Sequence, residues 1–165
     1  MASVSTLAHP PRVIGVYRRA DLPEGERPVT LALWRVADPG NVGTLIRSAD
    51  ALGPAALALS AGCADPTGPK ALRASVGAIF RVPLVGFDDA PRPRVALVAR
   101  EGAPLSQVEL GDRVTFVLGA EREGLPRDIV EACDGVASIP QEADAESLNV
   151  AIAGAIALHE WRRSR

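Results

Sequence analysis

Short apolar runs that alternate with helix-like segments restrict the fold of this chain more than any other feature of its sequence. The runs are typical of β-strands, and turn signals separate each run from the helical spacing that follows. They lie at residues 29–36, 56–60, 82–87, 94–100, 114–118 and 136–139. This alternation predicts an α/β fold with a mostly parallel sheet. Residues 31–34, 95–98 and 116–118 are apolar on both faces, so we expect helices on both sides of the sheet.

The length of 165 residues fits a single domain with a sizeable core. The only linker dense in proline and glycine is at residues 22–28. We therefore predict an extended lead-in over residues 1–27 and a folded domain over residues 28–165. No apolar run reaches the ~18 residues of a membrane helix, and residues 1–11 lack the pattern of a signal peptide. These features predict a cytoplasmic protein with no membrane partner.

The cysteines and histidines are few and scattered. Cys63 and Cys133 form no CxxC pair, and only His9 and His159 accompany them. This pattern predicts neither a disulfide framework nor a metal site.

The charge of the chain gives a mixed signal about nucleic acid. A net charge of -2 is not that of a dedicated nucleic-acid binder. Seventeen of the eighteen basic residues are arginine, however, and arginine suits bidentate contacts to phosphate. Six arginines gather near the two ends of the chain, namely Arg12, Arg18, Arg19, Arg162, Arg163 and Arg165. They are either solvated terminal charges or contacts to RNA.

The first segment with chemical potential follows the first predicted strand. Pro39-Gly40 predicts a turn and Asn41 the N-cap of a helix. Helical spacing places Gly43, Arg47 and Asp50 on the side away from the core. Arg47 is either half of an exposed ion pair with Asp50 or a contact to a ligand. Gly43, one turn before it, removes side-chain bulk and favours the ligand.

A glycine-rich turn follows the strand at residues 114–118. Gly119 and Gly124 flank Glu121 and Glu123 in this turn. A dinucleotide-binding turn needs glycine at the position of Glu121, and two carboxylates there would repel a pyrophosphate. The turn therefore disfavours a dinucleotide-dependent oxidoreductase. It suits a ligand without phosphates, such as the positively charged S-adenosylmethionine, or else it is a plain left-handed turn with solvated acids.

Near the C-terminus, Ser147 and Asn149 stand at the start of a helix that is apolar on nearly all sides. We expect this helix to pack against both the domain and a partner subunit. Ser147 is then either the N-cap of the helix or a functional group.

Together these segments resemble the three motifs of the SpoU/TrmH family of RNA ribose 2'-O-methyltransferases, which belongs to the SPOUT superfamily. The matching residues are Asn41-x-Gly43-x-x-x-Arg47, then Gly119-x-Glu121-x-x-Gly124, then Ile139-Pro140 followed by Ser147-Leu148-Asn149-Val150. The segment at residues 75–78 and the six-residue gap between Pro140 and Ser147 also match, and the similarity covers residues 28–161.

The resemblance implies a SPOUT-type α/β fold whose C-terminal part is threaded into a trefoil knot, an exception to the rule against knots. It also implies a homodimer through the C-terminal helix, an RNA substrate (tRNA or rRNA) and S-adenosylmethionine as methyl donor. Backbone atoms would hold the donor at Gly119, Ile139 and Leu148, with Ala120, Gly124 and the strand end at residues 97–99 as further candidates.

The resemblance also implies catalytic roles for Arg47, Asn41, Glu121, Ser147 and Asn149. Arg47 would clamp the phosphate of the target nucleotide and lower the pKa of the ribose hydroxyl electrostatically, because a guanidinium does not lose its proton in proteins. Asn41, Ser147 and Asn149 would position Arg47 and the ribose. Glu121 would orient its loop or pair with an arginine.

Two departures from the family pattern bear on this hypothesis. Gln141 replaces the apolar residue usual after Ile-Pro, and Glu142, Asp144 and Glu146 make the following loop acidic. An acidic loop weakens nonspecific binding of phosphate. The alternative hypothesis is therefore a noncatalytic knotted dimer that binds RNA or S-adenosylmethionine.

Overall fold

The computed structural model describes residues 15–142 and 147–165. Arg12 of the terminal arginines and Asp144 and Glu146 of the acidic loop lie outside the described residues, as does His9. Within the described part of the chain, no helix is both long and apolar enough to cross a membrane.

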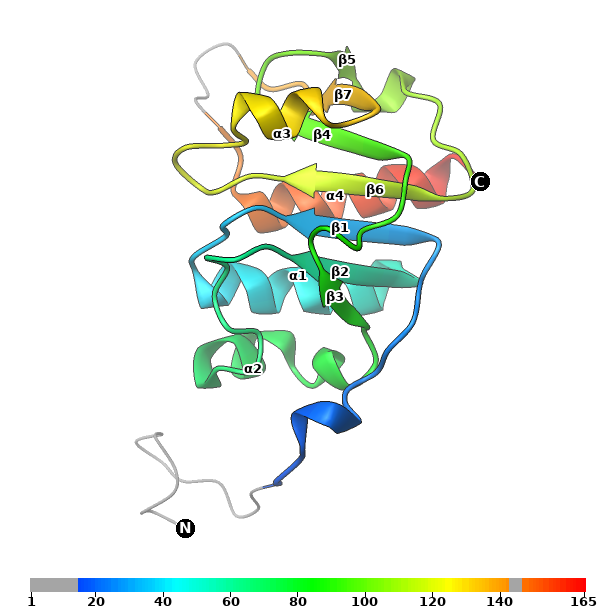
Figure 1. The fold of residues 1–165 in the computed structure, drawn as a ribbon. Coiled ribbons are helices and arrows are strands. Elements are labelled where there is room, and N and C mark those ends of the chain that lie inside the picture. The colour runs from blue at the N-terminus through cyan, green and yellow to red at the C-terminus, as the bar shows by residue number, and fades with distance from the viewer. Residues whose placement is uncertain (1–14, 143–146) are drawn as a thin grey trace.

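The strands form one sheet in the order β3-β2-β1-β6-β4-β7-β5 (Figure 1). Their bounds are β1 Val29–Leu33, β2 Ala55–Leu59, β3 Leu84–Gly86, β4 Arg94–Val98, β5 Ala103–Pro104, β6 Val114–Leu118 and β7 Gly135–Ser138. All pairings between these strands are parallel, which confirms the predicted sheet. The two-residue strand β5 was not predicted, because a run this short has no measurable periodicity.

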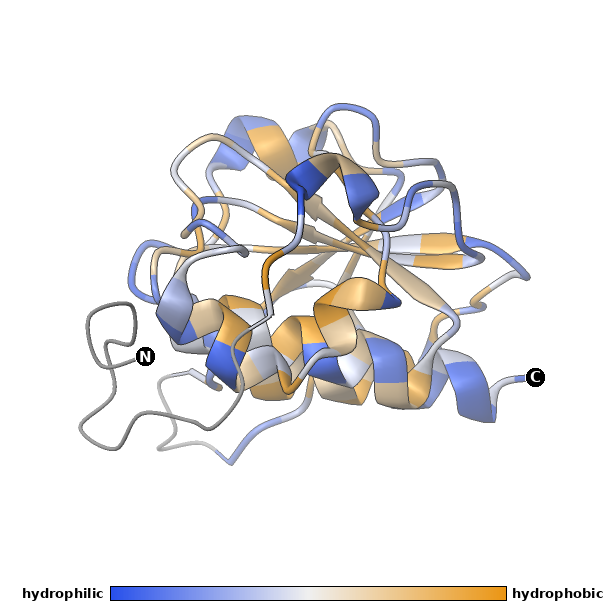
Figure 2. Cartoon of the chain, turned by 90° about the horizontal axis from the view of Figure 1, so that it is seen from below, coloured by the Kyte–Doolittle hydropathy of each residue, from blue (hydrophilic) through white to orange (hydrophobic). Residues whose placement is uncertain are grey.

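Helices lie on both faces of the sheet but cover them unequally. The α-helices are α1 Pro39–Leu52, α2 Pro69–Ser75, α3 Arg127–Glu131 and α4 Val150–Arg163. The described part of the chain also forms the short 3-10 helices η1 Arg19–Asp21, η2 Ala78–Phe80 and η3 Leu105–Gln107. Helices α1 and α4 cover one face, with α2 packed beside α1; among the described residues, the five-residue α3 is the only α-helix on the other face. Figure 2 views the molecule from below and shows the strands as a layer with helices on either side.

The second face is closed largely by a loop. Its buried strand residues are small, among them Ala32, Ala58 and Thr115, and Phe87 and Ala90 of the loop after β3 pack against this face. The hydroxyl of Thr115 donates a hydrogen bond of 2.7 Å to a carbonyl of the same loop. Small side chains let the loop approach the sheet closely, so this face is buried without a long helix.

Two glycines let the helices of the other face approach one another. A Cβ added at Gly43 would lie 2.4 Å from the carbonyl oxygen of Ala71 and 2.6 Å from the Cβ of Ala74 in α2. One added at Gly154 of α4 would lie 2.3 Å from a methyl of Leu45 in α1. The prediction that Gly43 makes room for a ligand is therefore wrong. The space that it leaves is filled by α2.

We expect Gly43→Ala to lower the free energy of unfolding by about 1–3 kcal/mol, because the new methyl meets backbone that cannot move aside cheaply. This loss exceeds the helix propensity gained from alanine, about 1 kcal/mol. Denaturant unfolding of both proteins measures the difference. Gly111→Ala is the matched control, since its added Cβ meets nothing nearer than 4.0 Å. Equal stabilities of Gly43→Ala and the wild type would contradict the packing role.

Candidate active site

A cavity of about 1170 Å³ lies at the carboxyl ends of β4, β6 and β7. Ligands of open parallel sheets bind at this edge, because loops from neighbouring strands meet there. The predicted site residues that line the cavity are Gly119, Ala120, Glu121, Gly124, Ile139, Ser147 and Leu148, together with the strand end at residues 97–99. The fold thus brings the second and third motifs to one place.

The turn after β6 forms one wall of the cavity and needs both of its glycines. A Cβ added at Gly119 would lie 2.2 Å from the carbonyl carbon of Gly124 and 2.5 Å from the amide nitrogen of Leu125. Gly124 has a φ of +67°, and its amide donates a 3.0 Å hydrogen bond to the carbonyl of Ala120. The turn is thus a tight left-handed reversal that carries Glu121 at its tip.

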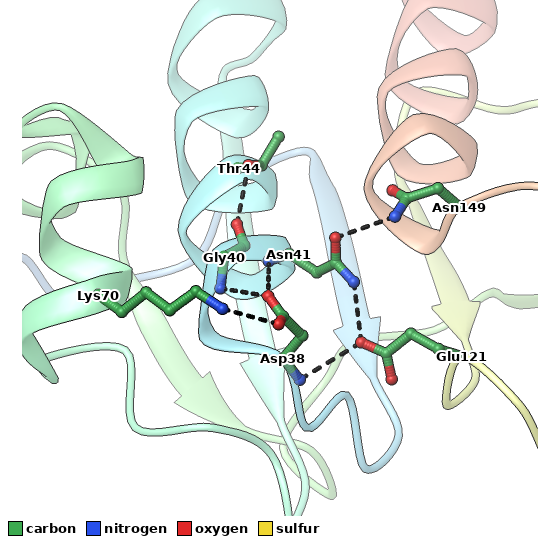
Figure 3. A network of polar contacts seen from close by, with 7 residues as sticks. All are labelled: Asp38, Gly40, Asn41, Thr44, Lys70, Glu121 and Asn149. Carbon is green, nitrogen blue, oxygen red and sulfur yellow. Dashed lines mark hydrogen bonds and ion pairs between the residues drawn. The ribbon is translucent and has the colours of Figure 1, made fainter.

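Side-chain hydrogen bonds join the three motifs (Figure 3). Of the three residues involved, Glu121 lines the cavity, whereas Asn41 and Asn149 line a separate groove between α1 and α4. The amide nitrogen Nδ2 of Asn41 donates to Oε1 of Glu121 at 2.9 Å. Asn149 in turn donates from Nδ2 to Oδ1 of Asn41 at 3.1 Å. Glu121 therefore does more than face solvent, because it accepts a charge-assisted hydrogen bond from the first motif.

The caps of both helices differ from those predicted. Asp38 is the N-cap of α1, where its Oδ1 accepts from the amides of Gly40 at 2.6 Å and Asn41 at 3.0 Å. Asn149 is the N-cap of α4, and its Oδ1 accepts from two first-turn amides. The prediction of Asn41 as the N-cap of α1 is wrong, and the N-cap alternative for Ser147 is excluded, because each helix begins at a different residue. As a result, the side chain of Asn41 is free to reach Glu121.

An ion pair strengthens the cap of α1. Nζ of Lys70 lies 2.9 Å from Oδ2 of Asp38, which joins the start of α2 to the start of α1. The hydrogen bond from Lys70 lowers the pKa of the Asp38 carboxyl below its usual value, and the capped backbone amides lower it further. Lys70 is the only lysine of the chain, yet its sequence context gave no sign of this role.

Arg47 lies on the exposed side of α1 and is not among the residues that line the cavity. Of the two alternatives for Arg47, the ion pair with Asp50 is contradicted, because Asp50 pairs instead with Arg81 at 2.6 Å. This contact lowers the pKa of the Asp50 carboxyl. No hydrogen bond or ion pair joins Arg47 to another residue within the described ranges. Its guanidinium is thus available for a partner outside its own chain.

Four of the terminal arginines pair with nearby carboxylates. The pairs are Arg18–Asp21, Arg19–Asp65, Arg163–Glu160 and Arg165–Asp112. These contacts neutralise much of the positive charge at both ends of the chain. They therefore favour solvated terminal charges over RNA contacts for these arginines. Exposed pairs of this kind contribute little to stability.

The comparisons with known proteins agree with this geometry. The sequence model of the SpoU rRNA Methylase family matches residues 28–159. The chain belongs to this family. RlmP of Bacillus subtilis, a 23S rRNA (guanosine(2553)-2'-O)-methyltransferase, is 35% identical over 141 residues, which are 80% of this chain and 57% of that relative. The chain spans little more than half the length of the first curated relatives it matches.

Solved structures of SpoU methyltransferases share the fold. An AdoMet-bound rRNA methyltransferase from Sinorhizobium meliloti matches with a TM-score of 0.77 and 34% identity, over 86% of this chain and 57% of that one. A structure that concerns the 2-OH methylation of C/U34 on tRNA matches with a TM-score of 0.75 and 27% identity. The match covers 85% of this chain and 97% of the chain in that structure.

The cavity of this SpoU-family chain also contains polar groups that sequence patterns did not single out. Charged residues at its rim include Arg100, Glu101, Arg127 and Glu131, which only the folding of separate loops brings together. Gln141 also lines the cavity, but its Oε1 has almost no accessible surface and no hydrogen-bond partner among the described residues. The supporting match at residues 75–78 forms the turn between α2 and η2 and lies outside the cavity lining.

A second, apolar groove runs between α1 and α4. Its lining includes Thr44 and Ser48 from α1 and Ile152, Ala155 and Ile156 from α4. Ile152 is 52% exposed, although the other face of α4 is buried in the core. An exposed isoleucine in an apolar groove is typical of a surface that another protein chain covers.

We expect Asp38→Ala to lower the free energy of unfolding by about 0.5–2 kcal/mol at neutral pH, because α1 loses its cap. The pKa of Asp38 is lowered in the folded state, so the stabilisation is full above the usual aspartate value of about 3.9 and is lost as pH falls through the lowered value. The difference in the free energy of unfolding between wild type and variant should therefore disappear at acidic pH. Denaturant unfolding over a pH series measures it, with Asp128→Ala in α3 as control. A difference independent of pH would contradict the assignment.

Proposed function

We propose that this chain is an S-adenosylmethionine-dependent methyltransferase that modifies a ribose 2'-hydroxyl of rRNA or tRNA. Membership of the SpoU family supports the proposal, as do the named activities of its relatives. The observation that carries it is the hydrogen-bonded line from Asn149 through Asn41 to Glu121, beside a cavity at the carboxyl edge of the sheet.

The residues of the cavity fit S-adenosylmethionine. The tight turn at Gly119 offers backbone atoms without side-chain bulk, and Glu121 and Glu123 suit a positively charged ligand. We assign cofactor binding to Gly119, Ile139 and Leu148, with Ala120 and Gly124 beside them. When bound, S-adenosylmethionine supplies a methyl group on a sulfonium. The trefoil knot implied by the family resemblance and the domain boundary at residue 28 stay predictions.

The catalytic task of the protein is to align the ribose hydroxyl and assist the loss of its proton. Asn41, Glu121 and Asn149 form the fixed part of the site, and Ser147 contacts the ribose. Arg47 binds the phosphate of the target nucleotide, and its positive charge stabilises the developing alkoxide. Arg47 is not itself the base, because a guanidinium does not lose its proton in proteins.

The active enzyme is a homodimer formed through α1 and α4. The apolar groove between these helices supports this arrangement, because it leaves Ile152 uncovered in the single chain. Thr44 and Ser48, the neighbours of Arg47 on α1, border the groove. In the dimer, Arg47 therefore serves the cavity of the partner subunit.

Arg47→Ala should lower the rate of methyl incorporation into rRNA or tRNA by about 100-fold or more, because the alkoxide loses its counter-charge. The rate of Arg47→Lys should lie between those of the wild type and Arg47→Ala, since lysine retains the charge and loses the bidentate geometry. S-adenosylhomocysteine binding, measured by calorimetry, should not change. Arg113→Ala, at the amino-terminal end of β6, is the control. Near-wild-type rates in both Arg47 variants would remove Arg47 from the mechanism.

The same assay distinguishes the noncatalytic alternative. A wild-type protein that binds S-adenosylhomocysteine but transfers no methyl to rRNA or tRNA would support a binding protein instead.

Coexpression of Arg47→Ala with the cavity-filling Leu148→Trp tests whether Arg47 acts across the interface. Mixed dimers retain one intact site, so about a quarter of wild-type activity should return. No return would place Arg47 in its own subunit's site.

Ile152→Glu should convert the dimer to a monomer without unfolding it, because a buried unpaired carboxylate in the interface is costly, whereas the side chain is half exposed in the single chain. Sedimentation velocity measures the mass, and circular dichroism checks the fold. Phe80→Glu is the matched control, since Phe80 is 51% exposed and lies outside the groove. A dimer that persists in Ile152→Glu would contradict the proposed interface.

A further inference from the structure

Arg35, in the loop between β1 and α1, has a backbone conformation that few residues adopt. Its φ is +53°, in the left-handed region, where a residue with a bulky side chain is strained. Among the described residues other than glycine, only Val76 also has a positive φ. The amide of Arg35 donates a 2.9 Å hydrogen bond to Oγ of Ser60, just after β2, which holds the backbone in place. Strain of this kind costs free energy and is concentrated at functional sites.

The loop also brings Arg35 close to one wall of the cavity. The amide of Trp34 donates a 2.8 Å hydrogen bond to the carbonyl of Leu118, so the pairing of β1 with β6 continues to the start of the glycine-rich turn. Arg35 comes next, at the carboxyl edge of the sheet, between that turn and the loop after β2. Three residues later, the amide of Asp38 donates to Oε1 of Glu121 at 3.4 Å. Arg35 thus belongs to the loop that leads into the first motif, although no motif includes it.

The side chain of Arg35 is oriented but unpaired. A Cβ added at Gly62 would lie 3.5 Å from Cγ and 3.4 Å from Nε of Arg35, so the arginine stem runs along this glycine. The residue is exposed, and its guanidinium makes no hydrogen bond or ion pair within the described part of the chain. The carboxylates of Asp38 and Asp65, in the same two loops, are each paired with another cation. The N–H donors of Arg35 are therefore available to a partner outside the chain.

The chemistry of this guanidinium favours a phosphate as the partner. It is planar, keeps its charge and matches two phosphate oxygens in a bidentate contact. The substrate of the proposed reaction is RNA, which carries a phosphate at every nucleotide. A strand whose target ribose lies at the cavity continues beyond the wall formed by the glycine-rich turn, and Arg35 lies on the other side of that wall. Contacts to phosphates position a nucleic acid without reading its sequence.

We propose that Arg35 binds a backbone phosphate of the substrate RNA, outside the target nucleotide. The inference rests on the proposed function, because it takes the RNA substrate from it. The task of Arg35 differs from that of Arg47. A phosphate away from the reacting atoms is held equally in the ground state and the transition state, so Arg35 lowers the KM for RNA and leaves kcat unchanged. The contact accounts for an arginine at a position where glycine or asparagine would be less strained.

Arg35→Asn tests the inference, because asparagine tolerates the left-handed conformation and carries no charge. Without RNA, the variant should melt about 1–4 °C above the wild type, since backbone strain is relieved. Filter binding to total tRNA and to total rRNA should show about threefold to tenfold weaker binding, because one charged contact is lost. The slope of log affinity against log salt concentration should shrink by about 0.7–0.9. In the methylation assay the KM for RNA should rise by the same factor as the affinity falls, with kcat unchanged.

Val76→Asn is the matched control. Val76 has a φ of +50° and is 64% exposed, so the substitution relieves the same kind of strain without removing a charge. Its melting temperature should rise, whereas its RNA affinity and salt slope should equal those of the wild type. Arg35→Lys keeps the positive charge and should retain the salt slope while losing part of the affinity.

Three results would each overturn the inference. The first is an RNA affinity and salt slope of Arg35→Asn equal to those of the wild type. The second is a fall in kcat at an unchanged KM, and the third is a lower melting temperature without RNA, which would indicate a structural role. A wild type that binds RNA through Arg35 but transfers no methyl group would instead contradict the proposed function and support Arg35 as an RNA contact.

Discussion

The arrangement of the site depends on one line of side-chain hydrogen bonds, from Asn149 through Asn41 to Glu121. Asn149 and Asn41 are 108 residues apart in the sequence, so no local preference of the chain brings them together. An asparagine amide has a donor end and an acceptor end, and both ends of Asn149 are in use. Its Oδ1 caps α4 while its Nδ2 donates to Asn41. The cap of one helix therefore also orients a side chain on the other.

The parallel sheet makes this line of contacts possible. Strands β1 and β6 are neighbours in register, so α1, which follows β1, and the glycine-rich turn, which follows β6, begin at the same edge. Gly154 then allows α4 to lie close against α1, with its N-terminus near Asn41. Small residues in the interior thus set the positions of polar residues at the surface. Stability and site geometry are linked at Gly43 and Gly154.

Much of the fold could be predicted from the sequence, because strands buried on both faces leave a continuous apolar signal. The convergence of Gly119, Glu121, Ile139 and Ser147 on one cavity agrees with the motif spacing. The helix caps were not predicted correctly, since several residues near each helix start are good caps and the choice depends on where the backbone turns. Gly43 was misread for a related reason. A glycine on the outer side of a helix leaves room for a ligand or for another helix, and only the position of α2 decides between them.

The close approach of Gly119 to the backbone of Gly124 has a consequence for how this site could diversify. One wall of the cavity is made of main chain, which point mutations alter far less readily than side chains. Any methyl on Gly119 would force the reversal open and change the wall as a whole. Side chains that line the rest of the cavity, such as Arg127, can be exchanged without moving the backbone. Under the proposed function, such an exchange would alter contacts to the RNA and leave the main-chain wall of the cavity unchanged.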